Sequence, residues 1–224
     1  MSRIGVVLSA GGSAFARSFD LSGLPADRFL ILTDRPCGAE EMARERDIQT
    51  IRIEEPDRAG LSQSCADRMS EADCHVALLH FSRLVDENLF ERIPTLNVHP
   101  GLLPAFPGLD GVGDAFAANS LFQGATLHWV DGGVDTGPAI SQCVSAVPKN
   151  ATLEWRQKLA YLHKVIVTLQ FMDWFADAAP QGLPSGGGDW IAEGAVWINP
   201  GMVSPHRQQQ VNALMQELPR RGRA

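Results

Sequence analysis

The 224-residue chain lacks the sequence features that mark several large protein classes. It contains no apolar run approaching the ~20 residues that a membrane-spanning helix needs. Its formal net charge is −7 at pH 7, so it has no basic excess of the kind that nucleic-acid-binding proteins carry. The only basic cluster is three arginines near the C-terminus, which we interpret as a solvated tail. We therefore expect neither membrane nor nucleic-acid binding.

Metal-binding, redox and nucleotide-binding motifs are also missing. The four cysteines include no Cys-x-x-Cys pair, which argues against a zinc site and against a redox motif. The N-terminus shows no signal-peptide pattern, so we expect reduced thiols in a cytoplasmic protein. The glycine turn after the first apolar run is neither Gly-x-Gly-x-x-Gly nor a Walker loop, which argues against a dinucleotide or ATP site.

The composition that is present, 45% hydrophobic and 20% charged, is sufficient for one large α/β domain or for a domain with an appendage. Short apolar runs alternate with helix-like segments along most of the chain. We predict strands at residues 4–8, 29–32, 50–53, 74–81, 95–98, 126–130 and 139–144, and helices at residues 14–19, 39–46, 61–70, 86–92, 113–119 and 153–176. This alternation predicts an α/β fold with a doubly wound, mostly parallel sheet.

The last part of the chain is predicted to be a short C-terminal extension. Residues 180–188 are rich in proline, glycine and serine, which indicates a linker or surface loop. We therefore divide the chain into a main domain at 1–178 and an extension at 179–224. The extension is expected to hold a small strand or hairpin and a final helix. It either packs on the domain or makes a homodimer contact, and the sequence leaves both uses open.

Residues 96–138 hold the side chains that are best suited to catalysis. Asn97 and His99 are two apart in an apolar run, so on a strand they would project from the same face. Pro100 ends that strand. Asp135 has a glycine two residues away on either side, in a loop able to approach another element. We expect the amide, the imidazole and the carboxylate to form one catalytic cluster.

These motifs resemble those of the 10-formyltetrahydrofolate-dependent formyltransferases, most closely the glycinamide ribonucleotide transformylase branch. That family carries Asn-x-His-Pro-Ser-Leu-Leu-Pro and, further on, an Asp-x-Gly-Pro turn. The matching positions here are Asn97, His99, Pro100, Leu102, Leu103, Pro104, Asp135, Gly137 and Pro138. A weaker similarity covers roughly residues 3 to 175. The resemblance implies a Rossmann-type fold and a one-carbon transferase that uses 10-formyltetrahydrofolate as its formyl donor.

The resemblance also implies roles for individual residues. Asn97 would donate its amide to the developing oxyanion. His99, held by Asp135, would polarise the formyl group or carry a proton. The folate-binding residues would be Arg83, Leu84, Val85, Leu103, Val130, Asp131, Gly133 and Val134. The acceptor-binding residues would be Gly11, Gly12, Ser13 and Pro100.

Two further histidines, His80 and His128, lie within apolar strands, and we interpret them as structural. A metal site combining them with His99 has no supporting ligand spacing, so we expect no metal.

Departures from the family pattern gather on the acceptor side. Ala14 replaces an asparagine of the phosphate-gripping loop, Gly101 replaces a serine, and Leu162 replaces the glutamate of a Glu-His pair in the last long helix. We therefore expect a retained folate donor and an altered acceptor, the amine of a small metabolite such as an amino sugar or an amino-acid-like compound. Two alternatives are phosphoribosylglycinamide formyltransferase of purine biosynthesis and a hydrolase that releases formate. The intact cluster disfavours a non-enzymatic sensor.

Overall fold

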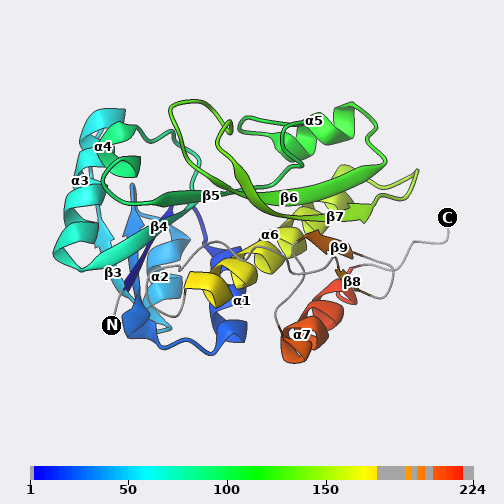
Figure 1. Ribbon diagram of the computed structural model, residues 1–224, viewed down its shortest axis with the longest axis horizontal. Coiled ribbons are helices and arrows are strands. Elements are labelled where there is room, and N and C mark those ends of the chain that lie inside the picture. Colours follow the sequence, from blue (N-terminus) through cyan, green and yellow to red (C-terminus); the bar gives the residue numbers. More distant parts are fainter. Residues whose placement is uncertain (1–2, 176–189, 193–195, 200–203, 219–224) are drawn as a thin grey trace.

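The computed structural model describes residues 3–175, 190–192, 196–199 and 204–218. Within them, nine strands form one sheet in the order β3-β2-β1-β4-β5-β6-β7-β9-β8 (Figure 1). The strands are β1 (Arg3–Leu8), β2 (Phe29–Thr33), β3 (Gln49–Arg52), β4 (Cys74–His80), β5 (Thr95–His99), β6 (Phe122–Trp129), β7 (Ala139–Ala146), β8 (Trp190–Ala192) and β9 (Val196–Asn199). None of the helices described is both long enough and apolar enough to cross a membrane.

The first five strands pair in parallel, with β1 between β2 and β4. Every residue of β2 is buried, as expected for short apolar runs covered on both faces. From β1 the chain winds outward to β2 and β3, then returns to β4 on the other side. This reversal opens a crevice at the carboxyl ends of β1 and β4, which is where doubly wound sheets bind ligands.

Helices cover both faces of the parallel half (Figure 1). Buried residues of α1 (Ser13–Ser22), α2 (Gly38–Arg44) and α6 (Leu153–Phe175) belong to one core cluster. Buried residues of α3 (Arg58–Glu71) and α4 (Glu87–Phe90) belong to a second cluster against the other face. The long helix α6 is apolar on most sides, which explains why it lies deep in the molecule.

The second half of the sheet is antiparallel. β6 pairs with β5 and with β7, and β9 continues the sheet from β7. The short helix α5 (Gly111–Ala117) lies between β5 and β6 in the chain. The last helix, α7 (Pro205–Met215), is preceded by the N-cap residue Ser204, whose hydroxyl accepts a hydrogen bond from the Arg207 amide. The described residues of the 179–224 extension thus build onto the main sheet, whereas the predicted linker at 180–188 lies outside the described residues.

The predicted α/β class with a doubly wound sheet is confirmed. The clearest difference concerns β6, which begins at Phe122, four residues before the predicted strand start at 126. Phe122 is exposed and Gln123 is polar, so no apolar run marks this end of the strand. Gln123 is nevertheless buried, because its side-chain amide donates to the Arg156 carbonyl at 2.6 Å.

Candidate active site

A cavity of about 290 Å³ opens at the carboxyl edge of the sheet. Its walls come from the ends of β1, β4, β5 and β6, from the loops that follow β5 and β6, and from one residue each of α3 and α6. Asn97, His99 and Asp135 all line it, so the three residues of the predicted cluster do meet. A lining of apolar side chains with a few convergent polar groups is typical of a small-molecule site.

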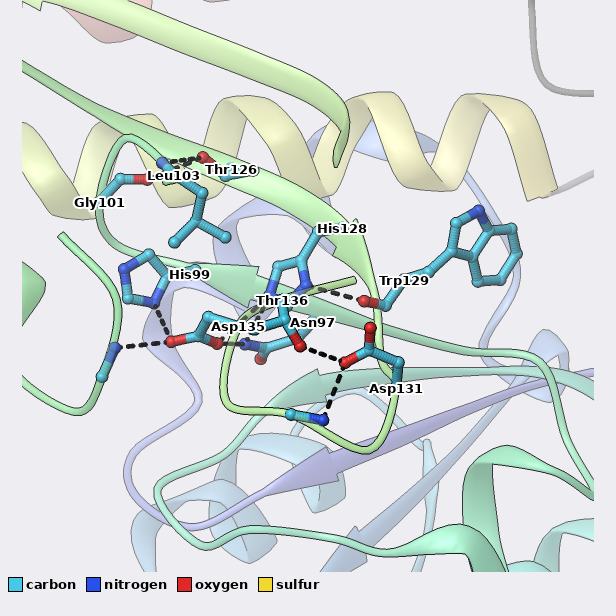
Figure 2. Close-up of polar contacts among 12 residues, drawn as sticks. Asn97, His99, Gly101, Leu103, Thr126, His128, Trp129, Asp131, Asp135 and Thr136 are labelled. Carbon is cyan, nitrogen blue, oxygen red and sulfur yellow. Dashed lines mark hydrogen bonds and ion pairs between the residues drawn. The ribbon is translucent and has the colours of Figure 1, made fainter. Parts of the chain in front are cut away.

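Asp135 is the point on which the cluster converges (Figure 2). Its Oδ2 accepts a hydrogen bond from the Gly108 amide at 2.8 Å and lies 3.3 Å from Nδ1 of His99. Its Oδ1 accepts from Nδ2 of Asn97 at 3.3 Å. The backbone of Asp135 has φ 55, a left-handed conformation that aspartate and asparagine tolerate better than most residues.

The loop that carries Asp135 is held by a second carboxylate. Asp131 Oδ1 accepts hydrogen bonds from the Gly133 amide at 3.0 Å and from the Thr136 hydroxyl at 2.6 Å. Gly137 passes so close to the Trp129 carbonyl that a Cβ there would lie 1.9 Å from its oxygen. Only glycine permits this approach, which explains the Asp-x-Gly-Pro turn in physical terms.

His128 belongs to the cluster, although the sequence led us to interpret it as structural. Its Nδ1 lies 2.8 Å from the Trp129 carbonyl, and a carbonyl can only accept, so Nδ1 carries the hydrogen. Its Nε2 lies 3.2 Å from Nδ2 of Asn97 and is free to accept from that amide. The same Nε2 lies 3.4 Å from Asp135 Oδ1, to which it can donate only when the ring is charged. Asn97 lies opposite His128 because β5 pairs with β6 in this register. A single sequence does not reveal this register, so the place of His128 in the cluster was missed.

His99 is enclosed by backbone. Its Nε2 donates to the Phe106 carbonyl at 2.6 Å, and its Nδ1 faces Asp135, so both ring nitrogens are engaged by the protein. A Cβ on Gly101 or Gly111 would lie 2.7 or 2.9 Å from that Nε2. The serine that the resemblance led us to expect at position 101 would therefore not fit beside this orientation of the ring.

Burial and charge act in opposite directions on the two ionisable groups. Burial lowers the pKa of His99, and this outweighs the Asp135 carboxylate and the Phe106 carbonyl, which raise it. Burial alone would raise the pKa of Asp135, but contact with His128, the Gly108 amide and His99 together lowers it. Asp135 is therefore a carboxylate near neutral pH.

Most of the predicted folate-binding residues line the same cavity. These are Arg83, Leu84, Val85, Val130, Asp131, Gly133 and Val134. The guanidinium of Arg83 bonds to backbone carbonyls, including that of Pro56 at 3.0 Å. Four apolar side chains beside a carboxylate suit a flat heteroaromatic ring with polar edges, which is the chemistry of a folate. Leu103 is not part of the lining; its backbone instead bonds to Thr126 and Gln142.

The predicted acceptor-binding residues divide into two groups. Pro100 lines the cavity, but Gly11, Gly12 and Ser13 do not. Gly12 has φ 66 and caps the N-terminus of α1, where a Cβ would meet the Met42 side chain at 2.8 Å. The cavity wall after β1 is formed by Ser9, whose hydroxyl lies 3.0 Å from that of Ser82.

The described residues contain no group of three side chains able to hold a metal ion. His80, one of the histidines weighed as a ligand, lies 3.0 Å through Nε2 from the Thr168 hydroxyl.

Comparison with known proteins gives consistent matches. A family model described as "Formyl transferase" matches residues 3–166. The phosphoribosylglycinamide formyltransferase of Mycobacterium tuberculosis is 37% identical over 147 residues, covering 61% of this chain and 68% of that protein. The protein of the same name from Bacillus subtilis is 33% identical over 165 residues, covering 69% and 84%. Among solved structures, glycinamide ribonucleotide transformylase 1 from Symbiobacterium toebii superposes with a TM-score of 0.72 at 26% identity, covering 82% of this chain and 92% of that one.

Proposed function

This chain belongs to the formyl transferase family, and we propose that the formyl group it takes from 10-formyltetrahydrofolate passes to the amine of a small metabolite through a tetrahedral intermediate. The observation that carries this proposal is the convergence of Asn97, His99 and Asp135 at the centre of one cavity. The transfer needs a donor for the developing oxyanion and a path for one proton. The cluster offers both.

Asn97 is the proposed oxyanion donor. Its Nδ2 lies 3.2 and 3.3 Å from its two acceptors, His128 and Asp135, which are long contacts for an amide. A formyl oxygen that develops negative charge is a better acceptor than a ring nitrogen of His128. We propose that it replaces His128 as a partner of Asn97 when the amine attacks the formyl carbon.

Asp135 is the proposed proton carrier. The attacking amine becomes positively charged as its bond to the formyl carbon forms, and it must lose a proton before the folate nitrogen leaves. Asp135 can accept this proton and return it to the leaving nitrogen, so the products are the formamide and tetrahydrofolate. His99 Nε2 is occupied by the Phe106 carbonyl, so we assign the ring a supporting role: in its charged form it donates to Asp135 through Nδ1.

The proposed acceptor is not the ribonucleotide. Two positions where the resemblance implies polar contacts to that acceptor are occupied by Ala14 and Leu162, both packed in the core cluster that includes α1 and α6. Neither supplies a polar side-chain atom. The second candidate is nevertheless phosphoribosylglycinamide formyltransferase, because the curated relatives carry that name.

The test is a single-turnover assay of 10-formyltetrahydrofolate consumption, run without amine and with a panel of amines that includes glycinamide ribonucleotide. We expect consumption with a small amine, and a loss of about 100- to 1,000-fold in rate for Asn97→Ala. Asn150→Ala, at an exposed position outside the cavity, is the matched control. Consumption without any amine would identify a hydrolase. An unchanged rate in Asn97→Ala would overturn the assigned site.

A further inference from the structure

Two charged side chains in the cavity, Arg58 and Lys164, have no role in the mechanism above. Arg58 donates through Nε to the Val85 carbonyl at 2.9 Å, on the side of the predicted folate-binding residues. Lys164 lines the cavity from α6 and is partly buried. It is one of only three lysines in the chain, with Lys149 and Lys158. Thr168, one turn further along α6, contacts His80 at the end of β4. Lys164 therefore lies beside the carboxyl end of β4, at the switch point of the sheet.

Lys164 has no partner of opposite charge among the described residues. Within the part of the chain that the structure describes, no carboxylate lies within ion-pair distance of its ammonium and no acceptor bonds to it. The carboxylates that line the cavity, Asp131 and Asp135, are bonded within their own loop and cluster. Burial lowers the pKa of Lys164, and no nearby negative charge opposes this. A partly buried, uncompensated cation costs stability, and buried charges in proteins are normally paired, so a bound ligand is the partner that remains for Lys164.

The position of Lys164 indicates which substrate it meets. The predicted folate-binding residues Val85 and Val130 pack with the core cluster beside α3 and α4. Lys164 comes from α6, which packs against the opposite face of the sheet. The reacting cluster lies at the end of β5, between these two sides. A ligand group at Lys164 thus reaches the cluster from the side opposite the folate residues.

We propose that Lys164 binds an anionic group of the acceptor, a carboxylate or a phosphate, and so selects amines that carry one. This inference rests on the proposed function and specifies its substrate class. The acceptor's anion would lie inside the cavity, and not at Gly11, Gly12 and Ser13, which are outside its lining.

Binding of the anion can be observed directly on the wild-type protein. With lysine carbon-13-labelled at Cε, the chain gives three lysine signals, which Lys149→Arg and Lys158→Arg assign. We expect the Lys164 signal to shift saturably with acetate or with inorganic phosphate, whichever matches the natural acceptor, while exposed Lys149 does not respond. No shift with either anion would overturn the proposal, and so would a shift caused by tetrahydrofolate alone.

Selection of the acceptor needs kinetics with matched amines. The panel pairs amino acids with their carboxamides and O-phosphoethanolamine with ethanolamine. We expect the anionic member of one pair to be the better acceptor, and Lys164→Met to raise its KM by about 10- to 100-fold, with Lys164→Arg recovering most of the loss. Lys149→Met is the matched control.

The outcomes separate this inference from the function on which it rests. A neutral preferred acceptor, or an unchanged KM in Lys164→Met, would overturn the role of Lys164 while formyl transfer stands. If the wild type consumes no donor with any amine, the proposed function fails, and the titration of the Lys164 signal still decides whether an anion binds there.

Discussion

At the scale of single residues, Asp135 determines the geometry of the cluster. It accepts from Gly108 and Asn97 and faces both His99 and His128. With 2% of the His99 side chain and 11% of the Asp135 side chain exposed, water screens their interaction poorly. The Asp135 carboxylate therefore raises the pKa of His99, although burial lowers that pKa by more.

Asp135→Asn isolates that charge. Asparagine tolerates the same left-handed backbone and nearly the same volume, but it cannot take a proton from the attacking amine. We expect kcat for formyl transfer to fall by about 100- to 10,000-fold. Asp20→Asn, which removes an exposed partner of Arg46, is the control. A fall of less than about 3-fold would exclude Asp135 as the proton carrier.

Gly101 is predicted to be intolerant of any side chain. A Cβ there would lie 2.7 Å from His99 Nε2 and 3.0 Å from the Phe106 carbonyl, and the ring is anchored at both nitrogens. We expect Gly101→Ala to lower the free energy of unfolding by about 1–3 kcal/mol and to lower kcat. Urea denaturation and steady-state kinetics measure both. Gly132→Ala, whose Cβ would meet nothing within 4 Å, controls for the loss of glycine in denaturation. If Gly101→Ala keeps the wild-type free energy of unfolding and the wild-type kcat, the His99 ring moves aside without loss and the prediction is wrong.

Sequence reasoning at this scale found the residues of one strand and one turn but missed their neighbour. Asn97 and His99 share a face because side chains alternate on a strand, and this alternation can be read from the chain. The role of His128 depends on the register between β5 and β6, which brings it opposite Asn97. In the sequence His128 is only a histidine in an apolar run, and such residues are usually structural.

At the scale of elements, Arg207 ties α7 to the main domain. It bonds to Asp173 of α6 at 2.8 Å and to the Ser22 carbonyl at the end of α1 at 3.0 Å. The two charged side chains are 10% and 15% exposed. The described parts of the extension are therefore held by a nearly buried ion pair as well as by the β7–β9 pairing.

Arg207→Met is expected to be costly because it leaves the Asp173 carboxylate unpaired and poorly solvated. We predict a loss of about 3–5 kcal/mol in the free energy of unfolding. Arg17→Met removes the pair with Glu217, whose side chains are 43% and 38% exposed, and should cost about 0–1 kcal/mol. Urea denaturation of the two variants provides the comparison. Equal losses would contradict the structural role of Arg207.

The strands that consist of one apolar run could be predicted from the sequence. Strand ends that lack such a run could not. The buried strands of the parallel half are recognisable because both of their faces are covered. The start of β6 is not, because exposed Phe122 and polar Gln123 interrupt the pattern, and Gln123 is buried only through its bond to Arg156.

At the scale of the whole molecule, burial of His80 and of His163 links stability to pH, because it lowers the pKa of each to about 3. His163 is fully buried, with Nε2 2.8 Å from the Ser145 hydroxyl, and burial lowers its pKa to about 3. The unfolded chain has the ordinary value of about 6.5, so between these values the unfolded state binds more protons. Stability must therefore fall as the pH is lowered below about 6.5.

The size of this effect can be measured by urea denaturation across pH. We expect His163 to lower the free energy of unfolding by about 2 kcal/mol between pH 6.5 and pH 4.5. His163→Gln should reduce the pH dependence of that free energy by the same amount. His206→Gln changes an exposed histidine and should leave the slope unaltered. If the free energy of unfolding depends on pH equally in the wild type and in His163→Gln, the buried ring of His163 is not held neutral.

The overall organisation explains which parts of the site a sequence can predict. Strand–helix alternation predicted the carboxyl edge of the sheet as the place of the site, and the cavity lies there. The place of Lys164 in the cavity was not predictable, because it depends on α6 packing along one face of the sheet and presenting one side chain near the end of β4. On the helix itself, Lys164 is one polar residue in an apolar segment.

The most direct test of the central claim follows the labelled formyl carbon of 10-formyltetrahydrofolate to its product. The account predicts that the label appears in the formamide of a small anionic amine, and that Asp135→Asn prevents its transfer. Label found in free formate without any amine, or passed with equal efficiency to glycinamide ribonucleotide, would contradict it.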